Sequence, residues 1–328
     1  MPGTTLSVAP GVRWVRMPLP FALDHINLWL LDDGDGVALV DTGVGLPETR
    51  ALWETLFRTE LDGRPLTRVI VTHFHPDHMG NAGWFAERDG VDVWCTEPEW
   101  RAAQTAWRNN GSHAVERRLA HYRRHGFADD AIERFRERGH HYPRMVPTLA
   151  PAVQHLADGD TVVIGGRRWD VFTVQGHAPD HACLWNREDD VLISGDQVLP
   201  KITTNVSVWP ERPASNPLRE YLDSLERFEP MHGDTLVLPS HGLPFRGLHA
   251  RLAGLRGHHD ARLAETLDAL GHPRSGVDLI PILFRRAMDT HQLSFAIGEV
   301  LAHLHLLESD GAVTRLTGDD EVDRFQRA

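Results

Sequence analysis

The most constraining feature of the sequence is a cluster of metal-binding residue types directly after a predicted strand. Residues 68–71 form an apolar run typical of a buried strand, and residues 81–88 have the apolar spacing of a helix. The loop between them carries four donors: His73, His75, Asp77 and His78. The carboxyl end of a strand is where α/β sheets bind ligands. Imidazoles and carboxylates ligate zinc and neighbouring divalent metals, and four donors in one loop exceed the needs of one ion, so we expect two metals.

Three later loops repeat the same arrangement. Predicted strands at residues 168–174, 191–193 and 235–238 are each followed within a few residues by a potential ligand. These ligands are His177, Asp196 and His241. Packing alone does not explain such a recurrence. We expect the four loops to converge at one edge of the sheet, as a site for two metal ions requires.

Composition narrows the class of protein. The chain has 328 residues, 41% of them hydrophobic, and its longest apolar runs are far shorter than a membrane span. No signal-peptide pattern is visible at the N-terminus, and only Cys95 and Cys183 occur, so we expect a cytoplasmic protein without a disulfide framework. The net charge of −12 argues against non-specific nucleic-acid binding, which depends on phosphate neutralisation.

The order of predicted strands and helices is typical of a layered α/β domain. We expect a catalytic domain over residues 1–250. Residues 97–144 are helical by pattern and predict an insertion, either a cap over the site or a solvated helix pair. Residues 251–328 predict a linking helix and a small domain of helices with a β wing.

The combined motifs His-x-His-x-Asp-His, Gly-His, Gly-Asp and Ser-His-Gly resemble those of the metallo-β-lactamase fold family, over roughly residues 12–250. The resemblance implies an αβ/βα four-layer sandwich. Residues 248–307 resemble the winged-helix tail of the lactamase-B-like subgroup. That subgroup includes glyoxalase-II-like hydrolases, acyl-carrier thioesterases and a mitochondrial single-strand endoribonuclease. For the tail of this chain we favour a packing or homodimerisation role over DNA binding, because acids outnumber its arginines.

The resemblance also implies a role for each site residue. The ligands of the first metal would be His73, His75 and His177. Those of the second would be Asp77, His78 and His241, with Asp196 bridging both ions. Asp41 would orient ligating histidines from outside the metal shell, and His181 would not be a ligand. The ligands suit zinc, with iron or manganese as alternatives.

These residues predict a hydrolase. A metal-bridging hydroxide would attack a carbonyl, and Asp77 would accept a hydrogen bond from the attacking water. No Gly-x-Ser-x-Gly elbow is present, so no serine nucleophile is implied. Flavodiiron-type redox chemistry is the rival within the fold, but its extra carboxylate ligands and flavin domain are not seen in the sequence.

The substrate is predicted less sharply. Residues 101–144 hold ten arginines against five carboxylates, which favours an anionic small molecule such as an acyl-CoA or hydroxyacylglutathione thioester. Expected substrate contacts are His25, Tyr142, Lys201 and Asn205. A lactonase or β-lactamase-like activity is the second hypothesis, and an endoribonuclease or nucleic-acid-binding module is the third.

Overall fold

The computed structural model describes residues 3–61, 63–109, 111–139 and 141–328. The chain forms two compact units. The first comprises Met1–Arg108, His141–Thr204 and Phe228–Arg251, and the second comprises Asn109–His140, Asn205–Arg227 and Leu252–Ala328. Each unit is therefore assembled from three segments that are separated in the sequence.

The first unit contains two β-sheets. The larger has seven strands in the order β1 (Thr5–Ala9), β2 (Val12–Pro18), β3 (His25–Asp33), β4 (Gly36–Val40), β5 (Leu66–Ile70), β6 (Asp92–Thr96) and β7 (Gln154–Leu156). The smaller has five in the order β12 (Leu236–Pro239), β11 (Val191–Gly195), β10 (His181–Asn186), β9 (Arg167–Val174) and β8 (Thr161–Ile164). Pairing is parallel from β4 to β7 and between β11 and β12, and antiparallel elsewhere.

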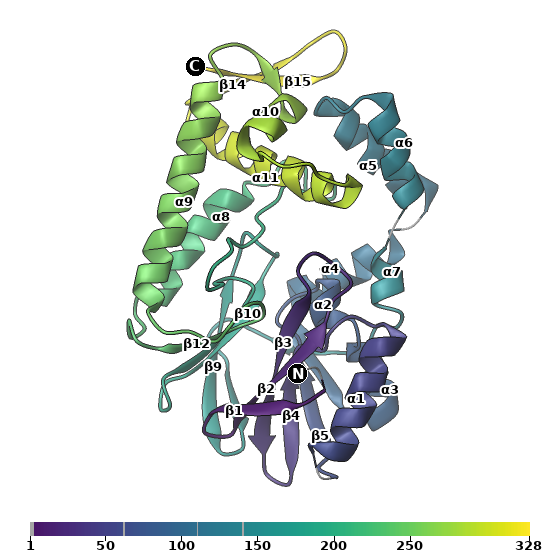
Figure 1. Cartoon of the computed structure of the whole chain (residues 1–328), viewed down its shortest axis with the longest axis vertical. Coiled ribbons are helices and arrows are strands. Elements are labelled where there is room, and N and C mark those ends of the chain that lie inside the picture. The colour runs from purple at the N-terminus through teal and green to yellow at the C-terminus, as the bar shows by residue number, and fades with distance from the viewer. Residues whose placement is uncertain (1–2, 62, 110, 140) are drawn as a thin grey trace. The chain divides into compact units, whose positions relative to one another are not determined.

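The helices of this unit are α1 (Pro47–Thr59), α2 (Pro76–Met79), α3 (Ala82–Asp89), α4 (Glu97–Arg108) and α7 (Tyr142–Met145). In Figure 1, α1 and α3 lie on one face of the larger sheet. Helix α1 begins with Pro47, whose fixed φ suits the first helical position. Its buried residues Thr49, Trp53 and Leu56 recur at helical spacing and so form one apolar face.

Strand β3 shows how the larger sheet supports two cores. Successive side chains of a strand point to opposite faces. Leu28 and Leu30 accordingly join a core that includes Trp53 of α1, whereas Trp29 joins a second core with Trp169 of the smaller sheet. The first unit therefore has a helix layer, the larger sheet and the smaller sheet in succession, and the predicted mixed α/β fold class is confirmed.

The second unit is mostly helical. Its helices are α5 (Ser112–Arg124), α6 (Asp129–Arg138), α8 (Pro217–Ser224), most of α9 (Leu248–Ala269), α10 (Gly276–Leu283) and α11 (Thr290–Ser309), and a 3-10 turn, Leu225–Phe228, follows α8. Its sheet has the order β13 (Arg274–Ser275), β15 (Asp323–Arg327) and β14 (Val313–Thr317). Capping boxes begin two helices: Ser275 with Asp278 at α10, and Asp289 with Gln292 at α11. The description of this region as a winged helix stays a prediction.

The predicted insertion, residues 97–144, is helical as expected, with α4 to α7 in it. The structure divides it, however, because α4 and α7 belong to the first unit while α5 and α6 belong to the second. A capping role over the site, and the domain boundaries at residues 250 and 251, stay predictions.

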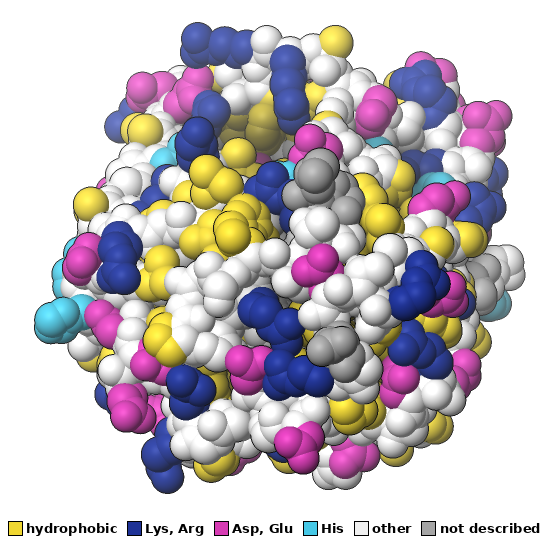
Figure 2. Space-filling model, turned by 60° about the horizontal axis from the view of Figure 1, so that its bottom comes forward, with side chains coloured by type: hydrophobic (Ala, Val, Ile, Leu, Met, Phe, Trp, Pro, Cys, Tyr) yellow, Lys and Arg dark blue, Asp and Glu magenta, His cyan; other side chains and the backbone are white. Residues whose placement is uncertain are grey.

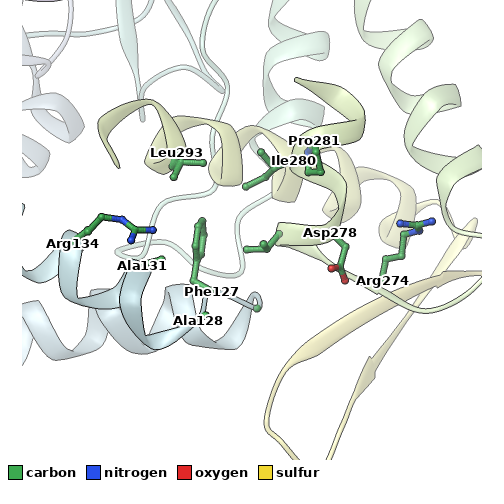
Figure 3. A pocket seen from close by; sticks show the side chains of 11 residues that line it. Phe127, Ala128, Ala131, Arg134, Arg274, Asp278, Ile280, Pro281 and Leu293 are labelled. Carbon is green, nitrogen blue, oxygen red and sulfur yellow. The ribbon is translucent and has the colours of Figure 1, made fainter. Parts of the chain in front are cut away.

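The second unit contains a pocket of about 560 Å³. Figure 3 shows Phe127 beside α6, with Ile280 of α10 and Leu293 of α11 opposite, and with Arg134 and Arg274 at the two ends. None of the residues that line this pocket is a predicted ligand or substrate contact.

The surface carries charge of both signs. On the face shown in Figure 2, acidic and basic side chains are interspersed with hydrophobic ones. Across the described ranges, no helix combines the length and the apolar character needed to span a membrane.

Candidate metal centre

The predicted ligands follow strand ends of the first unit. His73 to His78 follow β5, His177 follows β9, Asp196 follows β11 and His241 follows β12. Backbone hydrogen bonds join these loops directly. The Ala182 N–H donates to the Thr72 carbonyl at 2.9 Å, and the Ser240 N–H donates to the Gly195 carbonyl at 3.0 Å. The loops are therefore held together by the sheets from which they emerge.

The structure brings all seven predicted ligands together in two groups. The first group consists of His73, His75, His177 and Asp196. The second consists of Asp77, His78 and His241. In each group, one ligand atom from every residue lies within 4.8 Å of the others. This division matches the predicted division of the histidines between two ions.

In the first group, ring nitrogens face one another. His73 Nε2 lies 2.9 Å from His75 Nδ1 and 3.2 Å from His177 Nε2. Burial and the neighbouring imidazoles lower the pKa of both His73 and His75 well below the usual histidine value. Neutral imidazoles with converging lone pairs are the form in which histidine ligates a metal.

The carboxylate of Asp196 lies between the two groups. Its Oδ2 is 3.4 Å from His177 Nε2 in the first group. Its Oδ1 is 3.3 Å from His241 Nε2 and 3.6 Å from His78 Nε2 in the second. Asp196 Oδ1 and His78 Nε2 are buried and have no hydrogen-bond partner among the described residues. Since buried polar atoms are normally paired, these two orphaned ligand atoms fit a bound cation.

In the second group, the aspartates and the histidines shift one another's pKa values in opposite directions. Burial alone would lower the pKa of His241, but Asp196 and Asp77 outweigh it and raise that pKa to about 10. The same competition raises the pKa of His78, through Asp41, Asp77 and Asp196. Conversely, although burial opposes it, the histidines lower the pKa of Asp77 and hold that of Asp196 well below the usual range. The carboxylates thus concentrate negative charge where a cation would sit.

Asp41 lies behind the second group. Its Oδ2 accepts a hydrogen bond from His78 Nδ1 at 2.8 Å, and its Oδ1 accepts one from the Thr72 N–H at 2.8 Å. The protonated Nδ1 leaves His78 Nε2 directed at Asp77 and Asp196. Asp41 has a φ of 62°, a left-handed conformation that is uncommon outside glycine and that concentrates at functional sites.

The four predicted substrate contacts lie in different surroundings. The His25 carbonyl accepts a hydrogen bond from His241 Nδ1 at 2.8 Å, and His25 Nε2 accepts one from the Gly242 N–H at 3.0 Å. Tyr142 is buried, and its hydroxyl donates to the Phe74 carbonyl at 2.6 Å. Lys201 is exposed, and Asn205, in the second unit, accepts a hydrogen bond from Ser207. Their roles toward a substrate stay predictions.

Two further residues contribute to the site: Thr72, which was missed in the sequence, and His181, which the resemblance places outside the ligand set. The Thr72 hydroxyl lies within 3.2 Å of both His73 Nδ1 and His78 Nδ1, so it contacts one histidine of each group. His181 is fully buried, and its Nε2 accepts the Asp196 N–H at 3.2 Å. Gly195 makes this contact possible, because a Cβ there would lie 2.2 Å from His181 Nε2. Thr72 carries a signal in the sequence, since it directly precedes the histidine motif.

Comparison with known proteins agrees with this geometry. Residues 22–241 match the metallo-beta-lactamase superfamily, and residues 263–328 match the metallo-beta-lactamase-like C-terminal domain. The solved structure of a beta-lactamase domain protein from Burkholderia ambifaria is 47% identical, covers 100% of this chain and 96% of its own, and has a TM-score of 0.93.

Two curated relatives carry functional names. The probable metallo-hydrolase YqjP of Bacillus subtilis is 25% identical over 308 residues, 92% of this chain and 93% of that protein. The human acyl-coenzyme A thioesterase MBLAC2 is 28% identical over 206 residues, which is 58% of this chain and 65% of that protein. The predicted family is confirmed: the chain belongs to the metallo-β-lactamase superfamily.

Proposed function

We propose that this protein is a metal-dependent hydrolase of acyl thioesters that works with two divalent ions, zinc being the best match to its ligands. The observation that carries the proposal is the placement of Asp196, whose two carboxylate oxygens face different ligand groups. A carboxylate in that position is suited to bridge two ions. Two bound ions would supply a water that is deprotonated near neutral pH and would polarise a carbonyl oxygen.

Side chains of the protein provide access for the substrate, position the water and orient the metal ligands. Most of the ligands are buried, but Asp77 and His75 are partly exposed, which marks the side from which a substrate can approach. Asp77 Oδ2 lies 3.4 Å from His241 Nε2 and retains a second oxygen. That oxygen can accept a hydrogen bond from an attacking water and orient it toward the carbonyl carbon. His78 and His241 keep their Nε2 atoms directed inward because Asp41 and the His25 carbonyl engage their Nδ1 atoms.

The thioester class rests on two supports. The human relative is named as an acyl-coenzyme A thioesterase, although this chain aligns with only 65% of its length. The sequence also concentrates arginines in residues 101–144, and arginine pairs well with the phosphates of coenzyme A and the carboxylates of glutathione. We propose thioesters of coenzyme A, ahead of thioesters of glutathione, as the substrate class.

The test is a panel of acyl-CoA and acylglutathione thioesters of increasing chain length, with zinc-loaded protein and detection of the released thiol. We expect turnover of at least one series, its loss on chelation and its recovery on zinc addition. His75→Ala should lose both metal and turnover, whereas the matched variant His155→Ala, at an exposed histidine on β7, should keep both. Element analysis of protein purified without chelator identifies the native metal.

Two outcomes would contradict the proposal at different levels. Opening of a lactone or a cephalosporin reporter, with every thioester untouched, would overturn the substrate class and favour a lactonase or β-lactamase-like enzyme. Normal turnover by metal-depleted His75→Ala protein would overturn the metal centre itself.

A further inference from the structure

Glu99, in the first turn of α4, holds two of the ligand loops at once. Its side chain is completely buried. One carboxylate oxygen, Oε2, accepts the Phe74 N–H at 2.9 Å, and the other, Oε1, accepts the Asp180 N–H at 2.6 Å. Phe74 lies between His73 and His75, and Asp180 lies three residues after His177. A single carboxylate thus joins the loop that carries two ligands of the first group to the loop that carries the third.

The carbonyls of the same two residues are held as well. The Tyr142 hydroxyl donates to the Phe74 carbonyl at 2.6 Å, and the Thr96 hydroxyl donates to the Asp180 carbonyl at 2.8 Å. Thr96 and Glu99 have the spacing of a capping box, in which the glutamate would normally bond back to the start of its own helix. Here the carboxylate bonds to two loops from other parts of the chain.

The second ligand group is held differently. His241 is oriented by the His25 carbonyl, and His78 by Asp41. Neither contact involves Glu99. A change at Glu99 therefore acts on the spacing between the nitrogens of His73 and His177, 3.2 Å apart, while the second group keeps its own supports.

We propose that Glu99 is a positioning residue for one metal of the pair: it sets the distance between the two loops that supply His73, His75 and His177. The inference rests on the proposed two-metal centre. A buried carboxyl group that accepts two backbone N–H groups fixes the distance between their loops, and metal ligation demands ligand positions correct to a few tenths of an ångström. The tie therefore affects ion affinity more at the first group than at the second, which shares the loop through Asp77 and His78 but has supports of its own at His78 and His241.

The test is stepwise metal binding measured by chelator competition, with cobalt(II) absorption as the spectroscopic readout. Glu99→Gln is close to isosteric, but its amide nitrogen faces one of the two N–H groups, so one hydrogen bond is lost. We expect the ion of the second group to bind nearly as in the wild type and the ion of the first group to bind 10- to 100-fold more weakly, the range usual for partners outside the metal shell. Tyr142→Phe removes the hydroxyl that donates to the Phe74 carbonyl, leaves Glu99 in place, and should give a smaller loss at the same ion.

The control is Asn186→Ala. Asn186 is also fully buried in the first unit and accepts the Asp189 N–H at 2.8 Å, but it lies at the opposite end of β10 from the ligands. We expect it to lower the melting temperature of metal-free protein without changing either ion affinity. Unchanged binding of both ions by Glu99→Gln, or equal weakening of both, would overturn the inference. Wild-type protein that binds fewer than two ions would instead overturn the proposed centre.

Discussion

Replacing Asp41 with asparagine tests how the second ligand group is oriented. Asparagine has the same shape and tolerates the left-handed φ of 62° that Asp41 adopts, so the backbone can remain in place. Only the acceptor capacity changes. In the wild type one carboxylate oxygen accepts the Thr72 N–H and the other accepts the His78 Nδ1–H, both at 2.8 Å.

The asparagine cannot serve both donors, because one of its two terminal atoms is an NH2 group. If that group faces His78, the imidazole must lose its Nδ1 proton and carry a proton on Nε2, the atom directed at Asp77 and Asp196. If it faces Thr72 instead, two N–H donors meet in a buried site. Loss of a partner outside the metal shell typically weakens metal affinity 10- to 100-fold, about 1.4 to 2.8 kcal/mol.

The assay is zinc affinity by chelator competition, with turnover measured on the same preparations. Asp190→Asn is the matched control: Asp190 is also a non-glycine residue with positive φ, 52°, and its carboxylate accepts a hydrogen bond from Thr235 at 2.7 Å, but it precedes β11 at the end far from Asp196. We expect the control to bind zinc as the wild type does. Zinc affinity of Asp41→Asn within twofold of the wild type would refute the reasoning about the His78 tautomer.

Three further predictions follow from the structure. Gly195→Ala places a Cβ 2.2 Å from His181 Nε2 at a φ of 53°, so we expect a lower zinc content and a loss of stability above about 1 kcal/mol. The control is Gly166→Ala, which has a φ of 78° and open space around it and should lose stability without losing zinc. Trp53→Ala should lower the free energy of unfolding by about 3 to 5 kcal/mol in urea titrations, because Trp53 is completely buried against Phe85; a loss below 1 kcal/mol would contradict this packing. Burial and His121 lower the pKa of His125 to about 3, so below about pH 6.5 the unfolded chain binds a proton that the folded chain does not. This residue should therefore lower the free energy of unfolding by about 1.4 kcal/mol for each pH unit below about 6.5. His125→Gln should reduce that slope in unfolding curves at pH 7.5, 6 and 5.

The sequence predicts the apolar strands closely and the polar ones poorly. The predicted strands at residues 168–174 and 191–193 lie within two residues of β9 and β11, because buried strands read as apolar runs. Strands β1, β7, β13 and β15 were missed. β15 reads Asp-Arg-Phe-Gln-Arg, with only Phe325 to indicate a core-facing side, and its pairing with β13 and β14 decides its conformation.

The candidate site shows the same division. The convergence of seven ligands followed from their positions after strand ends, which a sequence displays directly. The direction in which each side chain points did not follow from the sequence. The Tyr142 hydroxyl is engaged by the Phe74 carbonyl and His25 by His241 and Gly242, contacts that join residues 68 to 217 positions apart. The tie through Glu99 was missed for the same reason, since its partners lie 25 and 81 residues away.

The two apolar cores of the first unit contain none of the predicted ligands. We therefore expect these cores to keep the first unit folded without metal, unlike small zinc domains that unfold when the ion leaves. If the expectation holds, metal-depleted protein should unfold cooperatively and should bind metal again after chelator removal without a refolding step.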